Sequence, residues 1–397
     1  MISVYDKKED CCGCTACEFI CPVNAIEMGP DEEGFLYPKI NQELCIDCGL
    51  CKKVCPIQNK FENIERFVEP KAYAVKHKSN KVRMESTSGG AYTAISDYAL
   101  NIQSVVYGAK FSEEFYLHHD RAINYNERDK FKGSKYIQSD LQDVFIRIKN
   151  DLTDGKGVLF TGTGCQVAGL VNYLVNKKVD TDKLITNDFI CHGTPSPLVW
   201  NDYLKFIQKR EKLVFYSFRS KDKGWHGYNV KTKFKSGKER INTADNRVYT
   251  SLYSSNLTLR PSCYNCKFTN LNRPSDIMIG DFWGIENTYP EIDDDIGISL
   301  VLVNTPKGKK IFNEIKPDLD FWESSTKDCL QLNLIKPTKR PKNRERFWQD
   351  YYNFDFEFIA NKYGGYSIKG RIRRKAGIAL KKLGLYESIK QLNKREK

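Results

Sequence analysis

The chain has 397 residues, a formal net charge of +13, 40% hydrophobic residues and 14 cysteines. This length predicts two or three domains, and the hydrophobic share indicates a globular protein with a packed core. The first residues, MISVYDKKEDCC, are charged and have no apolar segment, and the longest uncharged stretch, residues 157–176, is interrupted by Thr, Gly, Gln and Asn. The sequence therefore predicts a cytoplasmic protein and argues against a secretory signal and a membrane span.

The charge and the cysteines narrow the class further. Residues 1–60 hold six Lys and no Arg against ten acidic residues, whereas residues 369–397 hold eleven basic and two acidic residues. Because much of the basic charge lies in this tail, nucleic-acid binding is supported by little else. Fourteen cysteines in a chain without a signal segment argue against a disulfide framework and for metal ligands or redox thiols.

The first expected domain, residues 1–60, is built on a repeated cysteine pattern. The motif C-x2-C-x2-C-x3-C-P occurs at residues 11–22 and again at residues 45–56. It is typical of bacterial two-cluster ferredoxins, in which the fourth cysteine of each run ligates the other cluster. Zinc knuckles would instead show C-x2-C pairs separated by a finger. We assign cluster A to Cys11, Cys14, Cys17 and Cys55, and cluster B to Cys45, Cys48, Cys51 and Cys21; Cys12 is interpreted as a small packed side chain.

After a polar connector at residues 57–71, short strand-like runs alternate with helical ones to about residue 304. A hairpin over residues 228–242 indicates a mixed sheet, so the expected fold class is α+β (mixed α/β). The expected domains are 71–153 and 154–335, two parts of one catalytic domain, and a basic extension over 336–397. The predicted strands are 104–111, 157–162, 183–190 and 275–283, and the predicted helices are 91–101, 141–152, 166–175 and 198–209.

Three glycine-containing loops are candidates for binding an anion. STSGG (86–90) and TGTGC (161–165) each open a probable helix, where unpaired backbone N–H groups favour negative charge. GSKY (133–136) adds a lysine beside a glycine. Each loop alone also fits an ordinary turn or helix cap, and none has the Rossmann or P-loop spacing. The candidate binding residues are Ser86, Ser88, Gly89, Gly90, Gly133, Lys135, Tyr136, Thr161 and Thr163.

A lone C-x2-C at Cys263 and Cys266 makes half of a metal site. Cys165 ends the TGTGC loop, and Cys191 follows a predicted strand in DFICHGTPSP. Loops after strands are common places for cofactor ligands. The economical assignment is a third 4Fe-4S cluster held by these four cysteines. The rival interpretation is a catalytic thiol, either Cys165 at a helix N-terminus or Cys191 beside His192.

These residues resemble a known family, the beta subunits of the deazaflavin (coenzyme F420) reducing hydrogenases and dehydrogenases. The resemblance covers the ferredoxin module and the body to about residue 310. It rests on STSGG, GSKYIQSDL, FTGTGCQVAGL, DFICHGTPSP, FRSKDKGWHG and RPSCYNCKFTNLNRPSDIMIGDFWG. It implies a flavin, usually FAD, beside a 4Fe-4S cluster in the body. A flavin carries one or two electrons, so it joins one-electron clusters to a two-electron hydride carrier.

The resemblance implies that the glycine-containing loops bind the flavin. Candidate catalytic residues are His192, Asp281 and Trp225, with Trp283 and His226 as further pocket residues. A capping carboxylate, core aromatic rings and core histidines are the structural alternatives for the same positions. We expect an iron–sulfur flavoprotein oxidoreductase whose partner is a redox protein or a small hydride carrier: deazaflavin, nicotinamide or ferredoxin. The alternative is a non-catalytic electron-transfer subunit of a larger redox complex.

The C-terminal tail, residues 369–397, has apolar residues at loosely helical intervals among eleven basic ones. This pattern predicts a basic amphipathic helix that lies on an anionic membrane surface or docks a partner. A solvated helix packed on its own body fits the pattern equally well.

Overall fold

A computed structural model describes residues 3–59, 65–368, 370 and 372 of the chain. They fall into two compact units, each assembled from segments that are distant in sequence. The first unit contains residues 1–198, 217–229 and 259–339, and the second contains residues 199–216, 230–258 and 340–397.

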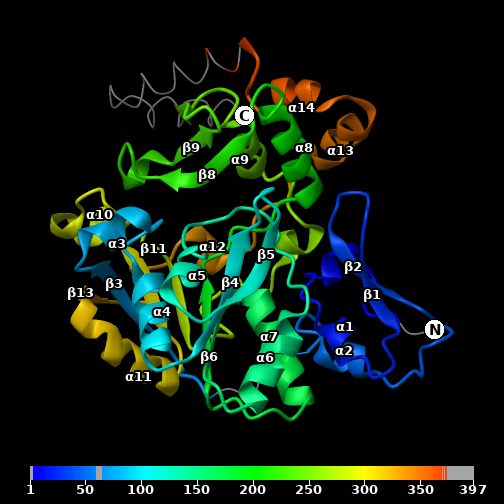
Figure 1. The fold of residues 1–397 in the computed structure, drawn as a ribbon, viewed down its shortest axis with the longest axis vertical. Helices are drawn as coiled ribbons and strands as arrows, with labels where there is room; N and C mark the ends of the chain where they lie inside the picture. Colours follow the sequence, from blue (N-terminus) through cyan, green and yellow to red (C-terminus); the bar gives the residue numbers. More distant parts are fainter. Residues whose placement is uncertain (1–2, 60–64, 369, 371, 373–397) are drawn as a thin grey trace. The chain divides into compact units, whose positions relative to one another are not determined.

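The first unit begins with a small module of two similar halves that follow the cysteine repeat (Figure 1). Left-handed backbone residues flank the second cysteine of each run: Gly13 and Thr15 in the first half, Asp47 and Gly49 in the second. Each half then forms a short helix that ends one residue before its fourth cysteine. The elements are the 3-10 turn η1 (Lys8–Asp10), α1 (Ala16–Ile20), β1 (Ile26–Pro30), β2 (Leu36–Ile40), which pairs antiparallel with β1, and α2 (Leu50–Val54).

The body of the first unit is an eight-stranded mixed sheet in the order β13-β3-β12-β11-β7-β6-β4-β5. The central strands β11, β7, β6 and β4 are parallel, and the outer pairings are antiparallel. This arrangement confirms the predicted fold class. The strands are β3 (Lys71–His77), β4 (Val105–Phe111), β5 (Leu117–Ala122), β6 (Val158–Thr163), β7 (Leu184–Phe189), β11 (Ile277–Asp281), β12 (Ser299–Val303) and β13 (Leu319–Ser324).

Helices contribute to apolar cores that include residues of this sheet. The helices α4 (Ala91–Asn101) and α11 (Pro306–Ile315) share one core, while α6 (Val144–Thr153) and α7 (Gly164–Asn176) share another with the ferredoxin module. Both helices of that module contact α7 (Figure 1). The shorter elements are α3 (Asn80–Glu85), α5 (Tyr125–Asp129), α10 (Ile285–Thr288), α12 (Leu332–Ile335) and the 3-10 turns η2 (Trp225–Gly227), η3 (Pro261–Asn265), η4 (Pro290–Ile292) and η5 (Lys316–Asp318).

The second unit has an aromatic core of its own. The Trp200 ring centroid lies 4.8 Å from that of Tyr249 and 5.1 Å from that of Tyr216. A three-stranded sheet in the order β10-β9-β8 contains the predicted hairpin, with β9 and β10 antiparallel. The elements that lie wholly or partly in this unit are α8 (Pro197–Ile207), β8 (Leu213–Ser220), β9 (Asn229–Phe234), β10 (Glu239–Ile241), α9 (Val248–Ser254), α13 (Arg344–Asn353) and α14 (Phe356–Lys362).

Each predicted strand and helix is present, with ends shifted by up to three residues. The helix expected from residue 141 begins later because Gln142 is left-handed, with φ of 46°. The predicted domain boundary after residue 153 falls at the end of α6, inside the first unit, and the division into catalytic parts stays a prediction. The tail helix expected over 369–397 lies almost wholly outside the described residues. Over the part of the chain that the structure describes, no helix is long and apolar enough to cross a membrane.

Candidate iron–sulfur site

Two of the predicted body ligands stand at the carboxyl ends of neighbouring parallel strands. β6 and β7 pair with Thr163 opposite Phe189. Cys165 and Cys191 each lie two residues beyond that pair, the first near the start of α7 and the second in the loop after β7. The register of the sheet therefore brings these two thiols to the same edge.

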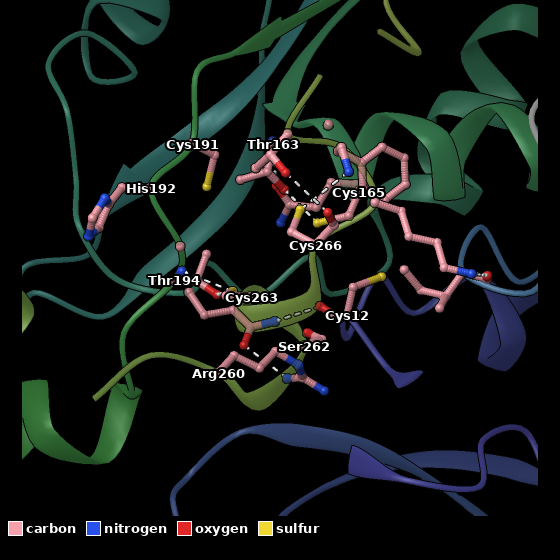
Figure 2. Close-up of a pocket in the computed structure, with 18 of the residues that line it drawn as sticks. Cys12, Thr163, Cys165, Cys191, His192, Thr194, Arg260, Ser262, Cys263 and Cys266 are labelled. Atoms are coloured by element: carbon pink, nitrogen blue, oxygen red, sulfur yellow. Dashed lines mark hydrogen bonds between the residues drawn. The ribbon is translucent and has the colours of Figure 1, made fainter. Parts of the chain in front are cut away.

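The other two body ligands come from the 3-10 turn η3 and the residue after it. Leu259 forms an antiparallel bridge with Pro195, and the Arg260 N–H donates to the Thr194 carbonyl at 2.9 Å. These contacts fix the turn against the loop that follows β7. As a result Cys263 and Cys266 line one cavity, here called the body cavity, together with Cys165 and Cys191 (Figure 2).

Hydrogen bonds reach three of the four sulfur atoms. The Thr194 N–H donates to Cys263 Sγ at 3.4 Å, the Phe268 N–H donates to Cys266 Sγ at 3.4 Å, and Thr163 Oγ1 lies 3.1 Å from Cys165 Sγ. Such bonds stabilise a thiolate and tune the potential of a cluster.

Burial raises the pKa of the Cys266 thiol to about 12, and burial together with the neighbouring thiols raises that of Cys191 well above its usual value. Only the thiolate binds a metal, so the positive charge of a bound metal would favour ionisation of these groups.

The predicted donor set of the body cavity consists of four thiols. Four thiols suit either zinc or an iron–sulfur cluster. Within the described ranges, no three His, Cys, Asp or Glu side chains are arranged to hold one metal ion. A zinc site would need its sulfurs about 2.3 Å from one point. In a 4Fe-4S cluster each cysteine binds a different iron, so the sulfurs stand further apart.

The ferredoxin cysteines lie in two groups. Cys21, Cys45, Cys48 and Cys51 line one cavity, although Cys21 belongs to the first run. In the other group, burial raises the pKa of the Cys17 thiol well above its usual value, and Cys11 and Cys55 raise it further because they lie close by. Similarly, burial raises the pKa of Cys55, with a contribution from Cys11.

Sequence reasoning missed two residues at the body cavity. Cys12, interpreted as a packed side chain, lines the cavity and lies close to Cys14 and Cys165. Arg260 lines the same cavity and donates from Nε to the carbonyl of Cys11 at 2.8 Å, across 249 positions of the sequence. No local pattern could predict a contact over that separation.

Two of the predicted cofactor loops, residues 86–90 and 133–136, touch each other. The Ser134 N–H donates to Thr87 Oγ1 at 2.9 Å. Gly89 donates its N–H to Ser299 Oγ at 2.8 Å, and a Cβ at this position would lie 2.2 Å from the Val75 carbonyl oxygen. The glycine is therefore required by the close approach of the loop to β3.

The polar side chains of these loops bond to nearby carbonyl groups. Ser86 Oγ donates to the Val82 carbonyl and Ser88 Oγ to the Ile298 carbonyl, both at 2.7 Å. Lys135 Nζ donates to the carbonyls of residues 131, 132 and 133. Burial of this ammonium group lowers the pKa of Lys135 to about 7.

Tyr136 links these loops to the predicted pocket residues. Its hydroxyl lies 3.5 Å from Arg219 Nη1, which also pairs with Asp281 Oδ2 at 3.0 Å. Asp281 Oδ1 in turn accepts a hydrogen bond from Trp225 Nε1 at 2.9 Å, so two of the three predicted catalytic residues are together. The Trp225 ring stacks on Trp283 at 4.5 Å with a 7° interplanar angle.

Arg219 and Lys221, in the FRSKDKGWHG segment, were not predicted as site residues. Arg219 is 8% exposed, and its Nη2 has no hydrogen-bond partner among the described residues. Lys221 Nζ donates to the Ser88 carbonyl at 2.7 Å. Burial, and then the charge of Arg83, lowers the pKa of Lys221 to about 7. The only signal in the sequence was the presence of cations in a segment already used for the resemblance.

The third predicted catalytic residue, His192, lines the body cavity (Figure 2). Its Nδ1 lies 3.4 Å from Asn333 Nδ2, while Gln331 donates to the Asp281 carbonyl at 2.9 Å. The segment at α12 thus touches both groups of predicted residues.

The two predicted threonines lie at the end of β6. Thr163 caps α7 with Gln166, and Thr161 Oγ1 accepts a hydrogen bond from Asn187.

Two parts of the chain match known protein families. Residues 10–59 match the 4Fe-4S dicluster domain, and residues 155–328 match the family described as the C terminus of the coenzyme F420 hydrogenase/dehydrogenase beta subunit. The second match spans all four body cysteines. The chain therefore joins a 4Fe-4S dicluster domain to a domain that is similar to the C terminus of coenzyme F420 hydrogenase/dehydrogenase beta subunits. It is an iron–sulfur electron-transfer protein.

Individual relatives match most of the chain or its ferredoxin module alone. The F subunit of the F(420)H(2) dehydrogenase of Methanosarcina mazei is 22% identical over 364 residues, covering 87% of this chain and 94% of that protein. A ferredoxin of Alicyclobacillus acidocaldarius is 42% identical over 52 residues, 13% of this chain and 58% of its own. A chain in the F420-reducing [NiFe] hydrogenase complex from Methanosarcina barkeri is similar at 16% identity, 68% and 85% coverage and a TM-score of 0.45.

Proposed function

We propose that the protein is an iron–sulfur flavoprotein oxidoreductase that passes electrons between three 4Fe-4S clusters and a hydride carrier through FAD. The observation that carries this proposal is the position of the body thiols. They lie beside the cluster A cysteines on one side and are connected through α12 with the Arg219–Asp281–Trp225 group on the other.

Helix α7 sets the order of the clusters. Cys165 near its start is a body ligand, and Gly169 lies one turn further along the same face, about 6 Å away along the helix axis. A Cβ on Gly169 would lie 2.8 Å from Sγ of Cys14, a cluster A ligand. On the same face Asn172 donates to the Val54 carbonyl at 3.2 Å, next to Cys55. Cluster A therefore faces the body cluster.

Cluster B is then the outer member of the row. Cys48 is exposed and Cys45 is half-buried, whereas Cys14 and Cys17 of cluster A are buried. Exposed apolar side chains, Leu44 and Ile46, flank the outer cysteines. Electrons would enter or leave as single electrons at this rim, by contact with a redox partner protein.

The hydride side of the reaction is assigned to the joined loops 86–90 and 133–136 with Arg219, Lys221 and Asp281. The unpartnered Nη2 of buried Arg219 fits a bound polar group. FAD, when bound, would accept or donate two electrons with a hydride and exchange them singly with a cluster. Asp281 holds Arg219 and Trp225 in place, and Lys221 Nζ, with its pKa near neutrality, can take up or release a proton there.

A non-catalytic electron-transfer subunit is the second candidate function. The hydrogen bonds of the loop side chains favour this function. Ser86, Ser88 and Lys135 all donate to carbonyl groups of the protein itself rather than pointing toward a ligand. Flavin content separates the two candidates, because a protein that only conducts electrons between clusters needs no two-electron group.

The test is anaerobic purification of the full chain, followed by cofactor extraction and assay. We expect bound FAD, and reduction of the flavin by one of four donors: reduced deazaflavin, NADH, NADPH or reduced ferredoxin. Protein that holds its clusters but contains no flavin, and binds none when FAD is added, would favour the non-catalytic role.

A further inference from the structure

Arg260 is a buried cation without an acidic partner. Its side chain is 1% exposed, and its guanidinium bonds to the Cys11 and Leu36 carbonyls at 2.8 and 2.9 Å and to Gln138 Oε1 at 3.0 Å. The group also lies 4.2 Å from the Tyr37 ring centroid. Within the described part of the chain no carboxylate pairs with it. A buried charge is costly unless an opposite charge balances it.

The nearest groups that can carry the opposite charge are cysteine sulfur atoms, which are negative as thiolates. Arg260 Nη2 points at Cys11 Sγ, a cluster A ligand, at a distance of 3.5 Å. Arg260 also stands three residues before Cys263 and lines the body cavity (Figure 2). One guanidinium therefore acts on the ligands of two predicted clusters.

We propose that Arg260 is a positioning residue that sets the reduction potentials of cluster A and of the body cluster. Each one-electron reduction adds a negative charge to a cluster that four thiolates already make anionic. A buried cation close to both clusters stabilises the added electron, and therefore raises both potentials. Gln138 and Tyr37 hold the guanidinium in place for this role. The proposal rests on the proposed assignment of the clusters.

The test is an anaerobic redox titration of the full chain, followed by EPR, of wild type and two substitutions. Arg260→Gln removes the charge but keeps a hydrogen-bonding side chain. Because the buried positive charge attracts the reduced cluster more strongly than the less negative oxidised one, we expect the equilibrium constant for one-electron reduction of cluster A to fall at least about tenfold. That change is about 59 mV toward lower potential, with a smaller shift in the same direction for the body cluster. Arg260→Lys keeps the charge and should stay within about threefold of wild type.

Lys267 supplies a matched control in the same segment. Its side chain is exposed, and its ammonium donates to the Ile57 carbonyl at 2.6 Å beside the same cavity. Lys267 also acts on Cys55, a cluster A ligand, but because water screens an exposed charge, Lys267→Gln should shift either potential by less than Arg260→Gln does. An equal shift in Lys267→Gln and Arg260→Gln would contradict a specific role for the buried group.

The proposal would also be overturned by unchanged potentials in Arg260→Gln, or by an equal drop in Arg260→Lys. If Arg260→Gln fails to assemble clusters, Gln138→Leu replaces it, since this change keeps the cation but removes its amide partner. The potential of cluster A should then fall, and an unchanged value would refute the idea. Wild-type protein without a third cluster would instead refute the proposed function, so the two failures are distinguishable.

Discussion

Replacing Gly169 with Ala would test whether cluster A is seated against α7. In an ordinary helix interior this change stabilises the protein by up to about 1 kcal/mol. Here the new Cβ would lie 2.8 Å from Cys14 Sγ and 2.9 Å from Cys14 Cβ, where ordinary contacts are 3.4–4 Å. Overpacking of this kind costs about 1–3 kcal/mol, so the net effect should be a destabilisation of up to about 2 kcal/mol.

The assay for Gly169→Ala compares thermal unfolding of the iron-loaded and the iron-free protein. With iron bound, Cys14 is fixed as a ligand and cannot move away, so the melting temperature and the iron content should both fall. Without iron, the Cys14 side chain can rotate, so the destabilisation should shrink. A variant with full iron content and a raised melting temperature would refute the placement of cluster A beside this helix.

Three further predictions concern the body cluster, a buried carboxylate and the tail. Cys263→Ser should reduce the iron content from about twelve to about eight atoms and abolish flavin-linked activity while sparing the ferredoxin clusters. The control Cys329→Ser, at a buried thiol outside the cavity, should keep all the iron. Normal iron content and normal flavin reduction in Cys263→Ser would show that Cys263 is not a cluster ligand. Burial raises the pKa of Asp151, but bonds to Arg121 and other groups outweigh it and lower the pKa to about 2. The ionised Asp151 contributes to stability above about pH 4, and this contribution is lost as the pH falls toward 2. Asp151→Asn should therefore unfold at a lower temperature than wild type at pH 6 but lose less stability on acidification. A melting temperature that falls equally in the two proteins from pH 6 to pH 2 would contradict this. The full chain should sediment with anionic vesicles at low salt and be released by added salt, and deletion of residues 369–397 should abolish binding without affecting flavin reduction; no binding at low salt would exclude the membrane role.

The central strands and the ferredoxin module were readable from local sequence. The cysteine runs have a fixed spacing, and β4, β6, β7 and β11 are short apolar segments between helices, as parallel strands usually are. The pairing of Cys165 with Cys191 also followed from a local rule, because both come directly after a strand. Such features depend on neighbouring residues, so the sequence displays them directly.

The antiparallel edges of the sheet were not predicted. β5 contains LHHDRA and β13 contains LDFWES, where polar and charged side chains mask the strand pattern. These strands owe their positions to pairing with β4 and β3. Their conformation is decided by partners distant in sequence, which local propensity does not record.

The interior charges were equally invisible in the sequence. Arg273 pairs with Asp188 at 2.5 Å although 85 positions separate them, and Arg260 reaches Cys11 across 249 positions. An isolated arginine in a loop usually lies in solvent. Only the folded chain shows which arginines are buried beside ligands and so belong to the site.

The central claim is that a third cluster in the body connects the ferredoxin clusters to a bound flavin. The most direct measurement is the iron, acid-labile sulfide and flavin content of the anaerobically purified full chain. We expect about twelve iron atoms, about twelve sulfides and one FAD for each chain. Eight iron atoms and eight sulfides in repeated preparations, without zinc and without flavin, would contradict the claim.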